Sequence, residues 1–110
     1  MAVNYKVLGQ VAPTNTSNAN LYTVPSATQA VVSTLLVTNT STTDAKCRIF
    51  VRIAGATASQ SNAVIYDADV TANDFKAITI GITLGATDVI TVYTNTANAL
   101  TFQAYGSEIA

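Results

Sequence analysis

The residue types that carry most enzyme chemistry are scarce in this chain. It has 110 residues, no histidine and a single cysteine, Cys47. The lack of histidine excludes Ser–His–Asp and Cys–His catalytic arrangements. One cysteine also excludes an intrachain disulfide and the usual zinc ligand sets. Cys47 lies on the apolar side of its predicted strand, so we expect a small core residue and not a reactive thiol.

Carboxylates are the remaining candidates for acid–base catalysis or cation binding. They are Asp44, Asp67, Asp69, Asp74, Asp88 and Glu108. Most fall in predicted turns, where aspartate ordinarily bonds to backbone amides, so we predict no catalytic pair. The segment "DADVTAND", residues 67–74, has oxygen ligands that calcium favours, but the EF-hand spacing is missing. We interpret it as a solvated strand end and a turn, and we predict no metal and no cofactor.

A row of basic and aromatic residues is the main candidate binding feature. Lys46, Arg48, Phe50 and Arg52 alternate with apolar residues and therefore share one face of a predicted strand. One interpretation is a face open to water, on which the long side chains lie along the sheet. The other is a docking surface, since arginine and aromatic residues are enriched at the centres of protein interfaces.

These residues must be positioned by strands, because no stretch has a convincing helical period. Short runs rich in Thr, Val and Ile alternate with turn residues, which is typical of β-proteins. The predicted strands span residues 3–11, 21–24, 31–39, 46–53, 63–70, 75–82, 88–94 and 100–105. We therefore predict one domain over residues 1–110, an antiparallel β-sandwich of about eight strands with jelly-roll or immunoglobulin-like topology.

The apolar positions predict two hairpins and a core. We expect residues 46–53 to pair with 31–39, and residues 88–94 to pair with 100–105. Several strands are apolar on both faces, which indicates surface buried against something other than the second sheet. The expected core residues are Leu35, Val37, Ile49, Val51, Ile78, Ile80, Ile82, Leu100 and Phe102.

Composition narrows the class of function. Charged residues make up 10% of the chain, hydrophobic residues 49%, and the net charge is −1. Nucleic-acid binding favours an excess of Lys and Arg, so we predict no nucleic-acid partner. No apolar run reaches the roughly 18–20 residues of a membrane span, so we predict no membrane association. The N-terminal "MAVNYKVLGQ" lacks the pattern of a signal peptide, and we expect synthesis in a cytoplasm.

Segments along nearly the whole chain resemble small structural proteins of tailed-bacteriophage virions, especially phages of cyanobacteria and marine bacteria. They are "MAVNYKVLGQ", "LYTVPSATQAVVSTLLVTNTS", "CRIFVRIAG", "DVTANDF", "ITLGATDVITVY" and "FQAYGSEI". None of these segments is a catalytic signature. The resemblance implies a non-enzymatic virion component, similar either to capsid cement and decoration proteins or to tail and fibre-associated proteins.

The leading hypothesis is a capsid cement protein that forms a dimer or trimer and clamps adjacent major capsid subunits. Such a protein is made in the host cytoplasm and lies on the capsid exterior. One alternative is a tail, baseplate or fibre-associated structural protein, and another is a glycan- or calcium-binding module for host attachment. The candidate partner-binding residues are Lys46, Arg48, Phe50 and Arg52 of the basic row, with Tyr5 and Lys6 of the N-terminal segment.

Overall fold

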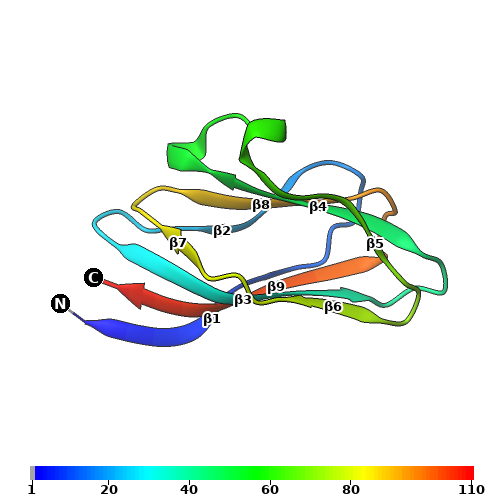
Figure 1. Cartoon of the computed structure of the whole chain (residues 1–110), viewed down its shortest axis with the longest axis horizontal. Helices are drawn as coiled ribbons and strands as arrows, with labels where there is room; N and C mark the ends of the chain where they lie inside the picture. Colours follow the sequence, from blue (N-terminus) through cyan, green and yellow to red (C-terminus); the bar gives the residue numbers. More distant parts are fainter. Residues whose placement is uncertain (1) are drawn as a thin grey trace.

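The computed structural model describes residues 2–110, which form two antiparallel β-sheets packed face to face (Figure 1). Two short 3-10 helices, η1 (Ile53–Gly55) and η2 (Gln60–Asn62), lie between the fourth and fifth strands. No helix within residues 2–110 has the length and hydropathy needed to span a membrane. The strands are β1 (Val3–Val11), β2 (Ala19–Thr23), β3 (Gln29–Asn39), β4 (Ala45–Arg52), β5 (Ala63–Val70), β6 (Phe75–Ile78), β7 (Ile82–Leu84), β8 (Val89–Thr94) and β9 (Leu100–Ile109).

The strand order identifies the sandwich as a jelly roll. The five-stranded sheet has the order β1-β9-β3-β6, with β7 also paired to β3, and the four-stranded sheet has the order β2-β8-β4-β5. When β6 and β7 are counted as one interrupted strand, successive strands alternate between the sheets everywhere except at β4 and β5. This alternation is the jelly-roll pattern, one of the two predicted topologies. The immunoglobulin-like topology does not fit, because its consecutive strands more often share a sheet.

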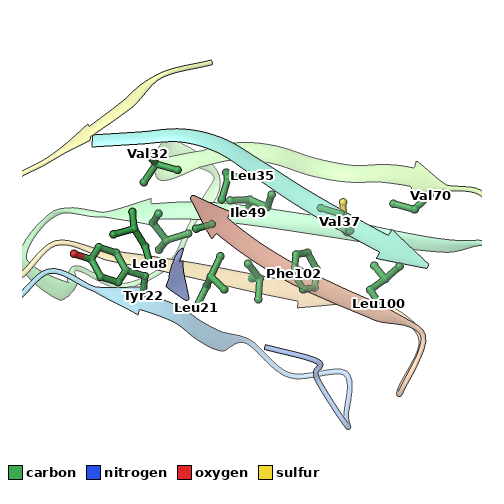
Figure 2. Packing of buried hydrophobic residues seen from close by; sticks show 14 of the residues in the cluster. Leu8, Leu21, Tyr22, Val32, Leu35, Val37, Ile49, Val70, Leu100 and Phe102 are labelled. Carbon is green, nitrogen blue, oxygen red and sulfur yellow. The ribbon is translucent and has the colours of Figure 1, made fainter. Parts of the chain in front are cut away.

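Both hairpins predicted from the sequence are wrong. β3 pairs with β9, β6 and β7, whereas β4 pairs with β5 and β8. β8 and β9 also belong to different sheets. The turns that precede β4 and β9 carry the chain from one layer to the other, and their residue types are the same as those of hairpin turns. Leu35 and Ile49 do lie in one buried cluster, but they approach from opposite sheets (Figure 2).

The strand predicted over residues 75–82 is interrupted. Ile78 ends β6 and pairs with Leu35, whereas Ile82 begins β7 and pairs with Val32. The segment between Ile78 and Ile82 therefore has one more residue than the facing segment of β3, and the ladder is interrupted between β6 and β7. Gly81 lies in the break with a left-handed φ of 60°, which glycine adopts without a steric penalty.

The core lies between the sheets and contains most of the predicted apolar set (Figure 2). Val51, Ile78 and Ile82 pack against it but are only partly buried. Ile80 is exposed, so its assignment to the core is wrong, because it falls in the break between β6 and β7. Cys47 is buried as expected, and burial raises the pKa of its thiol to about 11. The predicted core residues that are fully buried are Leu35, Val37, Ile49, Leu100 and Phe102.

A buried asparagine holds the connection between β3 and β4. Asn39 is the last residue of β3, and its Nδ2 donates to the carbonyl oxygens of Thr43 at 2.9 Å and Val70 at 3.0 Å. Its Oδ1 accepts from the amide of Ser41 at 2.9 Å and from the hydroxyl of the same residue at 2.7 Å. All the hydrogen-bonding capacity of the side chain is therefore used where the chain passes from one sheet to the other.

Candidate functional site

The basic row lies on the outer face of the four-stranded sheet, where Arg48 is bound within the protein. Its Nε donates to Asp67 Oδ1 at 2.7 Å, and its Nη2 donates to Asp67 Oδ2 at 3.3 Å. The guanidinium lies 4.2 Å from the ring centroid of Tyr66 and 4.5 Å from that of Tyr93. Asp67 is an extra residue in the β4–β5 ladder and has a left-handed φ of 57°. The resulting β-bulge turns its carboxylate toward Arg48. The hydrogen bond from Arg48 also holds the pKa of Asp67 below its usual value.

Arg52 fastens the loop that follows β4. Its Nε donates to the carbonyl of Ala56 at 2.6 Å, and its Nη2 donates to the carbonyl of Gly55 at 2.9 Å. Its Nη1 donates to the hydroxyl of Thr91 at 3.1 Å and to Asn20 Oδ1 at 3.3 Å. The donors that the docking hypothesis assigned to a partner are thus largely used inside the fold.

Phe50 does not face water, contrary to the alternation-based prediction. Only 4% of the residue is exposed, and its ring meets that of Tyr66 edge to face with centroids 6.4 Å apart. The loop that carries η1 and η2, fastened by Arg52, lies on this side of the sheet (Figure 1). The second apolar face of the central strands is therefore covered in part by the protein itself.

The acidic segment "DADVTAND" also bonds to groups of the protein. Asp69 Oδ1 accepts from Lys46 Nζ at 2.7 Å, and Asp74 accepts from the amide that follows it at 2.8 Å. Asp44, outside the segment, accepts from the amide of Ala72 at 3.0 Å. Over residues 2–110 there is no group of three or more His, Cys, Asp or Glu side chains placed to hold a metal ion. These contacts match a strand end followed by a turn.

The two N-terminal candidates point to opposite sides of β1. Tyr5 is 86% exposed on the outer face of the five-stranded sheet. Lys6 turns inward, and its Nζ lies 3.2 Å from Glu108 Oε1. The other oxygen of that carboxylate accepts from the Tyr22 hydroxyl at 2.5 Å. The Tyr22 hydrogen bond, followed by Lys6, lowers the pKa of Glu108, while burial and Glu108 raise the pKa of Tyr22.

The structure therefore does not unite the predicted partner-binding residues. Tyr5 lies on the outer face of one sheet, and the basic row lies on the outer face of the other. Within the row, Lys46 and Arg48 remain partly exposed, whereas Phe50 is buried.

The outer face of the five-stranded sheet is a surface of which the sequence analysis named only Tyr5, although it expected several strands to be apolar on both faces. Its side chains alternate with the buried ones along every strand of the sheet, and none of them is charged. Its exposed hydrophobic residues include Val3, Tyr5, Val7 and Phe75. A period-two run of uncharged residues is visible in each strand, but only the pairing places the runs side by side. The face consists of Val3, Tyr5, Val7, Gln10, Gln29, Val31, Thr34, Leu36, Thr38, Phe75, Ala77, Thr83, Thr101, Gln103, Tyr105, Ser107 and Ile109.

The sandwich is similar to part of a solved virus structure. That structure is of the infectious bursal disease virus Gx strain, and the TM-score is 0.50 with 16% sequence identity. The similarity covers 97% of this chain but only 31% of the virus chain, so this protein spans about a third of it. No family model matches this chain, and no curated protein matches it. At this identity the likeness concerns the β-sandwich fold.

Proposed function

We propose that the protein is a non-enzymatic structural component of a tailed-phage virion, a cement protein on the capsid exterior that clamps adjacent major capsid subunits. The observation that carries this proposal is the charge-free outer face of the five-stranded sheet. The protein has few charged residues, and none of them lies on this face. Four large hydrophobic residues on the face are exposed. Depletion of charge with exposed aromatic residues is the composition of an interface centre.

The size of this face suits a specific interface. It is four strand positions wide, and its longest strands have 9 to 11 residues. At about 4.8 Å between strands and about 3.3 Å per residue, its plan area is roughly 600 Å². Standard interfaces bury about 800 Å² per partner. The side chains that project from the face and the residues at its rim add to the plan area, so the buried area can approach this value. Many copies on a capsid lattice add avidity, so each contact can be modest.

The basic row is expected to contribute less to capsid binding than the charge-free face does. Lys46 is exposed and Arg48 is partly exposed, and each is already paired with an aspartate. The pair of Lys46 with Asp69 is exposed and therefore weak, so a partner carboxylate can compete for Lys46 at small cost. Arg48 is held more firmly, by two bonds to Asp67 and by the rings of Tyr66 and Tyr93. Arg52 and Phe50 support the fold, and we assign them no contact with the capsid.

The jelly-roll fold is compatible with this function. Jelly rolls occur in viral capsid domains and also in lectins. The similar solved structure is that of a virus, which supports a virion role by analogy alone. Because some jelly rolls are lectins, glycan binding is one of the outcomes that the experiments below distinguish.

Binding to empty capsids of the parent phage tests the proposal. Phe75→Glu places a charge on the outer face at a residue that is 62% exposed, so the fold should tolerate it. We expect occupancy on the capsids to fall by about tenfold or more, which corresponds to at least 1.4 kcal/mol. Ile53→Glu is the matched control, since Ile53 is 73% exposed but lies in η1, away from this face. Equal occupancy for both variants contradicts the docking face.

Three further measurements test the basic row and the alternative functions. A double substitution of Lys46 and Arg48 by alanine is expected to lower occupancy less than Phe75→Glu does. Hundreds of copies per particle indicate the shell, whereas about six or twelve copies indicate a tail or baseplate position. Saturable heat on calorimetric titration with host glycans or calcium, without capsid binding, would favour a host-attachment module.

A further inference from the structure

The sheet edges differ in how well they could accept another strand. β1 and β6–β7 form the edges of one sheet, and β2 and β5 form those of the other. β6–β7 is broken, β2 has five residues with a register shift, and β5 has two register shifts. β1 pairs with β9 without interruption from Val3 to Val7. Of the edges in residues 2–110, this segment alone has a regular row of free backbone groups.

The phase of the β1–β9 ladder shows which backbone groups face outward. Ala2 and Ala110 exchange both of their backbone hydrogen bonds, at 2.7 and 3.0 Å. Bonded pairs alternate along an antiparallel ladder, so the even-numbered residues of β1 bond to β9. The amides and carbonyls of Val3, Tyr5 and Val7 therefore point away from the sheet. Donors and acceptors at this two-residue spacing match an extended strand.

This row is complementary to a second copy of itself. In an antiparallel pair centred on Tyr5, Tyr5 bonds to Tyr5 of the second copy and Val3 bonds to Val7. All three outward residues are used, giving about six backbone hydrogen bonds at two for each bonded pair. Shifting the centre to Asn4 leaves part of the row unpaired. Shifting it to Lys6 places two ammonium groups opposite each other, which is unfavourable.

The side chains agree with the register centred on Tyr5. In that register the rings of the two Tyr5 residues would lie side by side on the outer face, and each Val3 would meet a Val7. Lys6 lies opposite Asn4, and its ammonium is turned inward to Glu108. The lysine that would otherwise guard this edge is thus neutralised within its own chain.

We propose that the protein forms a two-fold dimer in which residues 3–7 of β1 pair antiparallel with the same residues of a second copy. The two five-stranded sheets then become one continuous sheet, and their charge-free faces join into a surface twice as wide. The proposal rests on the proposed function, because this wider surface would bridge two adjacent capsid subunits.

Oxidative cross-linking of the purified protein tests the pairing. Tyr5→Cys places two thiols across the two-fold axis, with Cα atoms about 5.5 Å apart, a separation that a disulfide spans. We expect nearly complete conversion to a covalent dimer at micromolar concentration. Ile53→Cys, equally accessible but remote from the edge, should give at least tenfold less dimer, and the native Cys47 is buried. Equal cross-linking of the two variants overturns the proposal.

Sedimentation of a second pair of variants tests the backbone contacts. Tyr5→Pro removes an amide that faces outward, so the ladder to β9 is kept and the dimer is lost. Tyr5→Thr keeps the amide and removes only the ring, so it should remain dimeric with weaker association. A folded Tyr5→Pro protein that sediments like the wild-type dimer overturns the proposal, as does a monomeric wild type at high concentration. If Tyr5→Pro fails to fold, the cross-linking result decides. A monomer that still binds capsids contradicts the dimer alone, and a dimer that does not bind them contradicts the proposed function.

Discussion

Replacement of Asn39 by aspartate is the sharpest test of how the two sheets are joined. The substitution keeps the shape of the side chain and the oxygen that accepts from Ser41. It replaces the amide group that donates to the carbonyls of Thr43 and Val70 with a second oxygen. Two carbonyl groups at the crossing between the sheets then lose their donor and face a carboxylate.

The expected loss of stability follows from these two bonds. A buried polar group left without its partner costs about 1–3 kcal/mol, so the loss of two such bonds in Asn39→Asp should lower the free energy of unfolding by about 2–6 kcal/mol at pH 7. At roughly 4 °C per kcal/mol for a chain of this length, the Tm should fall by about 8–24 °C.

The loss should also depend on pH. Burial and the facing carbonyls favour the protonated form, so the pKa of the introduced carboxyl is raised in the folded protein. A raised pKa contributes stability below the unfolded value of about 3.9 and loses it as pH rises through the folded value. The difference between variant and wild type should therefore be smaller near pH 3 than at pH 7.

Urea unfolding at the two pH values measures both effects. Asn95→Asp is the matched control, because Asn95 is exposed and its Oδ1 accepts from the amide of Lys46 at 2.8 Å, which aspartate can also do. We expect this control to change stability by less than about 0.5 kcal/mol. A loss below about 1 kcal/mol for Asn39→Asp, or one that is the same at both pH values, would refute the reasoning.

Three further predictions follow from other contacts. Arg52→Ala removes four hydrogen bonds, two of which go to carbonyls of the loop after β4. Limited proteolysis of this loop should therefore be at least about tenfold faster, and an unchanged rate would contradict the role of Arg52. The hydrogen bond from Tyr22 is the main reason that the pKa of Glu108 is lowered in the folded protein. The free energy of unfolding should therefore fall as the pH drops below about 4.3, and it should fall less steeply in Glu108→Gln. Parallel pH profiles for the two proteins would contradict this role of Glu108. Gly106→Ala places a Cβ in steric overlap with the carbonyl oxygen of Val31 in β3, so the free energy of unfolding should fall by about 3 kcal/mol or more. Gly85→Ala, with its nearest contact at 3.7 Å, should cost less than about 1 kcal/mol in the same denaturant assay.

Residue alternation and turn residues predicted most of the strand positions and the class of fold. The predicted bounds of β1 and β5, residues 3–11 and 63–70, are those of the structure. Burial of Leu35, Ile49 and Phe102 was predictable from alternation alone. These features depend on neighbours one or two positions away, because the pleat makes the side-chain period two wherever a strand forms.

The pairing of the strands and the covering of their faces depend on contacts between distant parts of the chain. Whether the turn after Asn39 closes a hairpin or crosses to the other sheet depends on its contact with Val70, far along the chain. Phe50 alternates like a solvent-facing residue, yet the loop held by Arg52 lies on its side of the sheet. The charge-free face comes from strands near both ends and the middle of the chain, brought together by backbone pairing. Alternation is a local property, whereas pairing and coverage are set by the free energy of long-range contacts, which no short window of sequence contains.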